Sequence, residues 1–304
     1  MIDVPVDLFS GLLALPDGIF TRQDALRVGV TDDVLTAAVR RGVLIRPCRG
    51  AYTSPDTWAK GEARHLLARA ALRLYPDAVL AGAPAVRAHG IPLFEVPLVR
   101  VDIMRPVTSE ATTARLRIRP LRDEVVQTSW GPATDLPSSL VQLTMDHGIA
   151  SGLASFDAAL HTGAVTRDEL EAAYARVAGW PRSSRVRCAL AWSDGHAESL
   201  GESVTRAILL GAGWEVESQV LVADENGEIF ARADLGIKGT RVLLEFDGKV
   251  KYSDGGVDAL FREKRREDRI RAQGYVVVRV TWADLFHPER IVAAVQSALM
   301  AAVA

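Results

Sequence analysis

Two acidic residues in the last third of the sequence lie in apolar strand patterns, where a charged side chain is costly unless it has a partner. Asp234 lies near the end of the apolar run 229–235, and Glu245 lies inside the run 242–246. The short turn between the runs predicts neighbouring strands that bring the two carboxylates side by side. A divalent cation, Mg²⁺ or Mn²⁺, is a suitable partner, because it takes oxygen ligands and keeps bound water for chemistry.

More charged residues follow the second acid at every other position. Side chains alternate along a strand, so these residues are predicted to share one face if the strand continues. They are Glu245, Asp247, Lys249 and Lys251. A lysine on this face would steady developing charge or orient the nucleophile.

A helical pattern upstream offers a further acid. Glu198 and Glu202 are four residues apart, which places both on one face of a helix. The alternative for Glu202 is a solvated face on which it pairs with Arg206. The predicted catalytic residues are Asp234, Glu245, Asp247, Lys249 and Lys251. The predicted metal ligands are Asp234, Glu245 and Glu202.

The chemistry that suits this cluster is metal-assisted hydrolysis of a phosphodiester bond. A bound metal lowers the pKa of a water ligand and offsets charge on the scissile phosphate. The charged helix predicted at 258–273 could follow a phosphate backbone, and Arg265 and Arg269 are its candidate DNA contacts. The alternatives are a turn or strand-end role for Asp234, a structural salt bridge of Glu245 with Lys249 or an arginine, and an ordinary solvated face for the helix.

The elements that must position these residues can be read from local patterns. A helix is predicted at 198–210, followed by four strands. The Asn226-Gly227 pair predicts a tight turn between the first two strands. The strands are 216–222, 229–235, 242–246 and 275–280, and the charged helix precedes the last of them.

Residues about 194–287 resemble the restriction-endonuclease-like domain related to very-short-patch-repair endonucleases, in the PD-(D/E)XK superfamily. The matching segments are Glu198-Ser199, Glu202-Ser203, Gln219, Arg232-Ala233-Asp234-Leu235, Glu245-Phe246-Asp247-Gly248, Asp268-Arg269 and 274–281. The resemblance implies that Asp234 is the acid after the second strand, Glu245 and Asp247 the acidic pair of the third, and Glu202 the helix acid. Asp247 and Lys251 depart from the pattern, which usually has a lysine and, in this branch, a histidine there.

The N-terminal segment has the order of a winged helix-turn-helix. A short helix at 6–15 is followed by helices capped by Thr21 and Thr31, and then by β-like runs at 43–45 and 51–53. In a winged helix, the third helix enters the major groove and the hairpin touches the backbone. The candidate DNA-binding residues are Thr36, Arg40, Arg41, Arg46 and Arg49. The alternative is a protein-docking module with a solvated basic face.

This segment also resembles the N-terminal winged helix of AbiEi-family antitoxins. The resembling residues are 18–22, 41–44 and 49–52. The resemblance implies DNA binding and a partner toxin as a second kind of partner.

The composition fits a globular α+β chain. Its 304 residues include 48% hydrophobic and 24% charged residues, with a net charge of −2 and two cysteines. These values exclude collagen, coiled-coil and wholly disordered chains, and they favour a reduced, cytoplasmic compartment with no membrane span. We expect three domains: a winged helix at 1–58, an α/β connector or interaction domain at 59–185, and a restriction-endonuclease-like α/β core at 186–304.

The favoured function is that of a DNA-binding, Mg²⁺- or Mn²⁺-dependent endonuclease. The alternative is a non-catalytic DNA-binding regulator or antitoxin-like protein with a degenerate nuclease domain, which Asp247 favours. A nuclease acting on RNA stays open. The sequence leaves the oligomeric state and the target undetermined.

Overall fold

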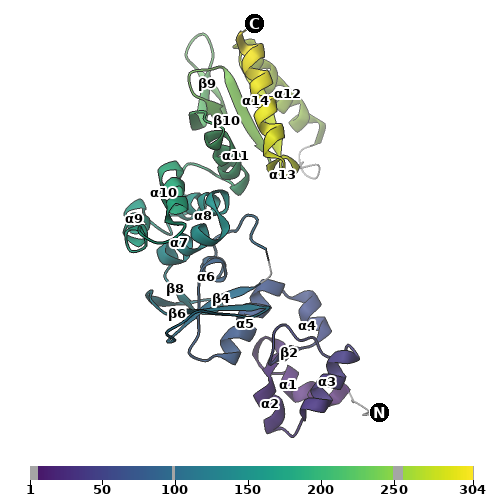
Figure 1. The fold of residues 1–304 in the computed structure, drawn as a ribbon. Helices are drawn as coiled ribbons and strands as arrows, with labels where there is room; N and C mark the ends of the chain where they lie inside the picture. The colour runs from purple at the N-terminus through teal and green to yellow at the C-terminus, as the bar shows by residue number, and fades with distance from the viewer. Residues whose placement is uncertain (1–5, 98–99, 249–255, 304) are drawn as a thin grey trace. The chain divides into compact units, whose positions relative to one another are not determined.

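The fold was analysed in a computed structural model that describes residues 6–97, 100–248 and 256–303 (Figure 1). It has the predicted α+β class. The chain forms two compact units, Met1–Leu143 and Thr144–Ala304, and the boundary falls within α7 (Leu136–His147). This boundary lies inside the segment that the sequence assigns to a middle domain.

The N-terminal part of the first unit is a small helical bundle with a two-stranded sheet. Its core gathers aromatic side chains, and the ring of Phe20 stacks on Phe9 at 6.1 Å and on Tyr52 at 5.5 Å. Leu35 and Leu44 complete this core. The elements are α1 (Ser10–Leu13), β1 (Ile19–Thr21), α2 (Arg22–Arg27), α3 (Asp32–Arg40), β2 (Ala51–Thr53) and α4 (Pro55–Lys60).

The strand predicted at 43–45 is reduced to a single bridge. Ile45 exchanges two backbone hydrogen bonds with Thr53, while β2 pairs along its length with β1 instead. Val43 and Leu44 both donate to the carbonyl of Ala38, so the end of α3 holds them out of a strand. The basic loop 46–50 still connects Ile45 to β2, in the position of a wing.

The rest of the first unit is a six-stranded mixed sheet with the order β5-β6-β4-β3-β8-β7. Two helices, α5 (Ala63–Leu74) and α6 (Ala83–Ala88), pack against it. Leu66 and Leu67 of α5 share a core with Leu80 and Ile103 of the sheet. The strands are β3 (Val79–Leu80), β4 (Val101–Arg105), β5 (Ala111–Thr112), β6 (Leu116–Pro120), β7 (Val125–Thr128) and β8 (Gly131–Thr134).

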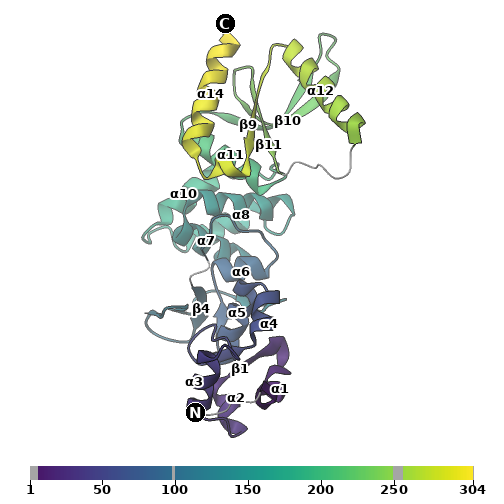
Figure 2. The same cartoon turned by 90° about the vertical axis from the view of Figure 1, so that its right-hand side faces the viewer.

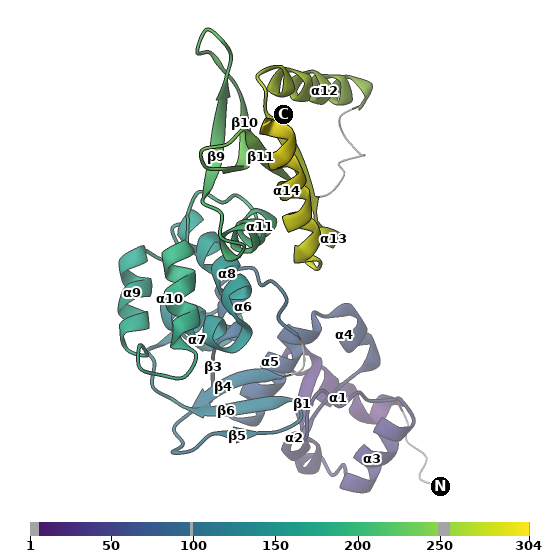
Figure 3. The same ribbon diagram turned by 45° about the horizontal axis from the view of Figure 1, so that its top comes forward.

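The second unit begins with helices and continues as a four-stranded sheet of order β12-β11-β10-β9. β9, β10 and β11 are antiparallel neighbours, and β12 lies parallel to β11. Figures 2 and 3 show α12 on one side of this sheet and α11 and α14 on the other. The helices are α8 (Ile149–His161), α9 (Arg167–Ala175), α10 (Ser183–Trp192), α11 (Leu200–Gly211), α12 (Gly256–Ala272), α13 (Trp282–Leu285) and α14 (Pro288–Val303). The strands are β9 (Val216–Ala223), β10 (Ile229–Ile237), β11 (Val242–Asp247) and β12 (Val276–Thr281).

Candidate functional site

The first candidate site is the exposed basic surface of α3 and the 46–50 loop. Thr36 and Arg40 lie four residues apart on α3, which places them on one helix face. The five DNA-binding residues predicted in this N-terminal segment are all exposed. They are Thr36, Arg40, Arg41, Arg46 and Arg49. In the part of the chain that the structure describes, no carboxylate forms an ion pair with Arg40, Arg46 or Arg49, so these charges are available to a ligand.

Capping interactions and an ion pair fix the start of α3 relative to α2. Thr21 and Asp24 form a capping box at the start of α2, and Thr31 caps α3 by accepting from a backbone N–H. Arg22 makes a bidentate pair with Asp32, with N···O distances of 2.6 and 2.5 Å. This pair ties the start of α2 to the first turn of α3.

The second candidate site is a row of polar residues that crosses the C-terminal sheet. Glu245 on β11 pairs directly with Arg279 on β12. The pairing of Leu235 with Leu244 places Asp234 opposite Glu245 at the next step. On the other side, the pairs Ser218–Leu235 and Val220–Ala233 place Gln219 opposite Asp234. We call Gln219, Asp234, Glu245 and Arg279 the polar row.

The hydrogen-bonded ladder between β10 and β11 ends where the polar row begins. Asp234 Oδ2 accepts a hydrogen bond of 2.7 Å from the backbone N–H of Phe246. A side chain thus takes a backbone donor that a continuing ladder would use. The carboxylate is thereby fixed between the two strands, as the sequence predicts for neighbouring acids.

Acids and arginines together line a cavity of about 200 Å³ at this point. The lining residues are Arg232, Asp234, Glu245, Asp247, Arg266 and Arg279. Glu245 and Asp247 share it, in agreement with their predicted common face. Arg266 of α12 donates to Glu245 Oε1 at 2.8 Å. Lys249 and Lys251 lie outside the described residues.

Sequence reasoning did not assign the arginines of this cavity to the acidic cluster. Arg232 alternates with apolar residues on β10, and Arg266 and Arg279 come from segments that reach β11 only in the folded chain. Arg232 lies two residues before Asp234, and this spacing is a local signal for it; no local signal marks Arg266 or Arg279.

Glu202 lies at the buried start of α11, with 7% of its surface exposed. Its Oε2 accepts from the backbone N–H of Glu198 at 2.9 Å and from Gln219 Nε2 at 3.2 Å. Its Oε1 accepts from the hydroxyl of Ser199, the N-cap residue, at 2.8 Å. Glu202 therefore joins the helix terminus to the polar row.

Two parts of the predicted helix pattern are wrong. Glu198 precedes the N-cap of α11, so it does not share a helix face with Glu202; it pairs with Arg232 at 2.9 Å instead. Arg206 does not pair with Glu202 either, because it forms a buried ion pair with Asp157 of α8. The Ser199 cap explains the first difference, since it starts the helix after residue 198.

Burial raises the pKa of both central acids above their ordinary values. For Glu202 the main cause is burial, to which the charges of Asp234 and Glu198 add. Burial also raises the pKa of Asp234, and the negative charge of Glu198 adds to the shift against the lowering effects of the Phe246 N–H and Arg266. The charge of Asp234 thus disfavours the charged form of Glu202, while Arg232 and Arg266 favour the charged form of Asp234.

Oxygen donors of this site fit a hard divalent cation. Asp234 and Glu245 supply carboxylates, and the Oε1 atom of Gln219 is buried with no hydrogen-bond partner among the described residues. The described residues include no group of three or more His, Cys, Asp or Glu side chains spaced as a metal site. Any cation here would therefore need an amide, backbone or water oxygen beside the carboxylates.

The predicted DNA contacts on α12 have different surroundings. Arg265 is exposed. Arg269 lies over the ring of Phe230 at 4.1 Å and pairs with Asp224 at 3.7 Å. Arg269 is thus engaged with the β9–β10 hairpin, whereas Arg265 faces solvent.

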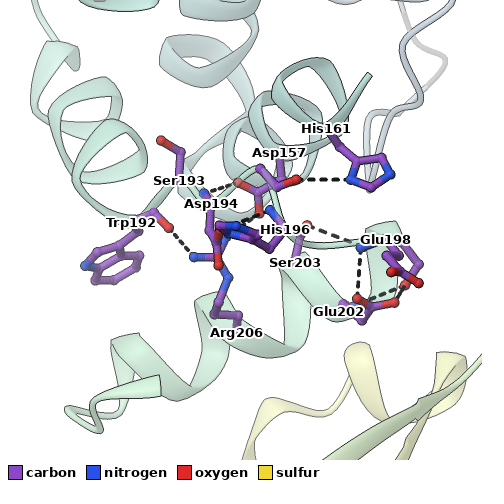
Figure 4. A network of polar contacts seen from close by, with 12 residues as sticks. Asp157, His161, Trp192, Ser193, Asp194, His196, Glu198, Glu202, Ser203 and Arg206 are labelled. Atoms are coloured by element: carbon purple, nitrogen blue, oxygen red, sulfur yellow. Dashed lines mark hydrogen bonds and ion pairs between the residues drawn. The ribbon is translucent and has the colours of Figure 1, made fainter. Parts of the chain in front are cut away.

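A buried network supports the helix that carries Glu202 (Figure 4). Asp157 on α8 accepts from Arg206 on α11 and from the backbone N–H of Asp194 at 2.7 Å. Arg206 also donates to the carbonyl of Trp192. The network fixes α11 against α8, one turn after the acid.

The comparisons with known proteins bear on the N-terminal segment. Residues 13–55 match a family model described as a transcriptional regulator, AbiEi antitoxin. The predicted resemblance of this segment is therefore confirmed, and the match includes α2, α3 and the 46–50 loop. The resemblance of residues 194–287 to restriction-endonuclease-like domains stays a prediction.

The chain is also similar to two uncharacterized proteins of Mycobacterium tuberculosis, from strain CDC 1551 / Oshkosh and strain ATCC 25618 / H37Rv. Each is 29% identical to it over 134 residues, which is 44% of this chain and 48% of the relative. The chain thus spans about half the length of the curated relatives it matches. None of its described helices is long and apolar enough to cross a membrane.

Proposed function

We propose that this protein binds duplex DNA through its N-terminal unit, in the manner of a transcriptional regulator. α3 would enter the major groove with Thr36 and Arg40, and the 46–50 loop would touch the backbone with Arg46 and Arg49. The observation that carries the proposal is the set of exposed arginines on α3 and the loop, within the segment that matches the AbiEi family. Arginine suits both contacts, because it is always charged and can bind guanine or phosphate through two donors.

The test is selection of binding sites from random duplexes, followed by affinity measurements at fixed salt. Arg40→Ala and Arg49→Ala are expected to weaken binding to the selected site, by about 1–3 kcal/mol for a base-contacting arginine. Lys60→Ala on α4 removes an exposed charge outside the proposed surface and serves as the control. Wild-type affinity in both arginine variants would refute the proposal. Loss of binding on adding a second protein would point to the antitoxin-like role with a partner toxin.

The second candidate function is metal-dependent hydrolysis of DNA by the C-terminal unit. It is favoured by the polar row, which brings Asp234 and Glu245 to one cavity beside Glu202, in the order that the nuclease resemblance implies. Asp234 and Glu245 would hold Mg²⁺ or Mn²⁺. When bound, the metal supplies an activated water and neutralises charge on the phosphate.

The chain's own residues would do the remaining work. Arg232 and Arg266 lie beside the acids and would attract and orient the phosphodiester group. Asp247 takes the place of the usual lysine, so proton transfer would fall to another group. The alternative for the C-terminal unit is a degenerate nuclease domain used for binding.

Calorimetric titration of Mn²⁺ and Mg²⁺ tests this candidate, with supercoiled plasmid and single-stranded RNA incubated in parallel. Binding and cleavage are expected in wild type and absent in Asp234→Asn. The Lys238→Ala variant, which alters an exposed pair with Glu215 just beyond the ends of β10 and β9, is the control. A wild type that neither binds metal nor cleaves either substrate would overturn the catalytic candidate and leave the DNA-binding proposal untouched.

A further inference from the structure

Gln219 has a backbone conformation that is unusual for its residue type. Its φ is +57°, and it is the one residue other than glycine with positive φ inside a described strand. A left-handed conformation is costly for a residue with a long side chain, and such strain concentrates at functional sites. An asparagine or glycine would adopt the same conformation more readily.

The place of this strain in the sheet is informative. Gln219 lies opposite Asp234, between the regular pairs Ser218–Leu235 and Val220–Ala233. The positive φ therefore falls on the polar row, separate from the register shift between Ile229 and Ala231 near the end of the hairpin.

One polar atom of the Gln219 side chain has a hydrogen-bond partner, and the other has none among the described residues. Nε2 donates to Glu202 Oε2 at 3.2 Å, which fixes the orientation of the amide because a carboxylate can only accept. Oε1 is then left buried and without a hydrogen-bond partner among the described residues. A buried amide oxygen without a partner is costly, and native structures explain most such groups by an ion or water.

The surroundings limit what can satisfy this oxygen. Two carboxylates are close to it: Glu202 is hydrogen-bonded to the same amide, and Asp234 lies opposite on β10. An electron-rich oxygen beside two acids calls for a positive or donating partner, and hard divalent cations take amide oxygens as readily as carboxylates.

We propose that the Gln219 amide oxygen completes the coordination sphere of a divalent cation held by Asp234, with the Nε2–Glu202 bond locking the amide in place. The proposal deepens the second candidate function and rests on it. It also gives a reason for the strained backbone of Gln219. The positive φ would direct Oε1 of Gln219 towards the cation, which a residue in regular strand conformation would not do.

The experiment combines Gln219→Gly with two reference proteins, wild type and Asp234→Asn. Mn²⁺ affinity is measured by calorimetry, and unfolding without metal is followed in urea. Gln219→Gly is expected to fold with a midpoint equal to or above that of wild type, because glycine removes the strain. Its Mn²⁺ affinity is expected to fall about tenfold or more, in the range seen when groups that support a metal are removed. Gln219→Glu, which keeps an oxygen, should bind Mn²⁺ more tightly than Gln219→Gly.

The outcomes separate the two claims. If wild type binds Mn²⁺ and Asp234→Asn does not, but Gln219→Gly binds as wild type does, the coordination role of Gln219 is overturned while the metal site stands. If wild type itself binds no Mn²⁺, the metal site and the role of Gln219 fall together. If Gln219→Gly unfolds at much lower urea, the residue serves the fold through Glu202, and Gln219→Glu then decides whether its oxygen matters for Mn²⁺.

Discussion

Arg206 on α11 donates to the carboxylate of Asp157 on α8, and their side chains are only 5% and 0% exposed. The residues are 49 positions apart in sequence, so the pair fixes two helices that local structure cannot relate. A buried pair contributes little net stability relative to apolar residues, but removal of one partner leaves an uncompensated charge. The pair therefore fixes the position of α11 relative to α8, and it fixes the position of Glu202 on α11 as well.

Removal of the Asp157 carboxylate should be strongly destabilising. We expect Asp157→Ala to lower the free energy of unfolding of the second unit by about 3–5 kcal/mol, because Arg206 stays buried without a counter-charge. Urea unfolding followed by tryptophan fluorescence measures the change. Lys60→Ala breaks an exposed pair with Asp56 and should change stability by less than about 0.5 kcal/mol. An Asp157→Ala protein as stable as the Lys60→Ala control would contradict this account.

A second relationship holds α11 against the sheet. Gly201, next to Glu202, lies so close to the ring of Phe246 that a Cβ atom at position 201 would overlap the ring. The ring also packs edge-on against Trp282 at 5.3 Å, so it has little room to move. Glycine is needed here for close approach of helix and strand, not for an unusual φ.

Gly201→Ala is expected to destabilise the protein by about 1–3 kcal/mol through overpacking. Gly211→Ala in the same helix meets nothing nearer than Trp192 at 4.0 Å, so it should be neutral or mildly stabilising. Thermal unfolding of both variants makes the comparison. The double variant Gly201→Ala/Phe246→Leu should recover part of the loss. Equal melting temperatures for the two alanine variants would show that the close approach is not limiting.

Features that depend on neighbouring residues could be predicted from the sequence. The capping boxes of Thr21 with Asp24 and of Thr166 with Glu169 are present, because each needs only residues three apart. Gly148 separates α7 from α8 with a φ of +101°. The Asn226-Gly227 turn joins β9 to β10, and Gly227 has positive φ.

Features that depend on distant segments could not be predicted. The acids Asp234 and Glu245 were found because each interrupts an apolar strand, which is a local signal. Arg266, which donates to Glu245, lies 21 residues further along the chain, in α12. No local pattern in either segment predicts this pairing. The positive φ of Gln219 is also invisible in the sequence, since glutamine has no preference for it.

Cys48 predicts a dependence of stability on alkaline pH. Burial is the main cause that raises the pKa of its thiol from 9.0 to about 11, against the lowering effect of nearby arginines. The unfolded chain therefore loses this proton near pH 9 while the folded chain keeps it. The stabilising effect is complete below pH 9, declines as pH rises, and is lost above about pH 11.

The variant Cys48→Ala should remove this decline, so the difference in unfolding free energy between wild type and variant should shrink from pH 8 to pH 11. Urea unfolding at a series of pH values measures it. Reaction with a thiol reagent at pH 8 gives an independent check, since Cys48 is buried and should react much more slowly than the partly exposed Cys188. Rapid modification of both thiols in the folded protein would argue against the raised pKa.

Salt dependence distinguishes the two parts of the proposed DNA surface. Each phosphate contact releases counterions, so the logarithm of affinity falls with the logarithm of salt concentration by about 0.9 for each contact. Arg46→Ala and Arg49→Ala should each reduce this slope by about 0.9, because the 46–50 loop is placed on the backbone. Thr36→Ala should leave the slope unchanged and alter the preferred base, because α3 is placed in the groove.

Anisotropy titrations between about 50 and about 200 mM salt provide the slopes. If Arg46→Ala and Arg49→Ala keep the wild-type slope while Lys60→Ala lowers it, the loop is not the backbone contact and the orientation of the N-terminal unit on DNA must be reversed.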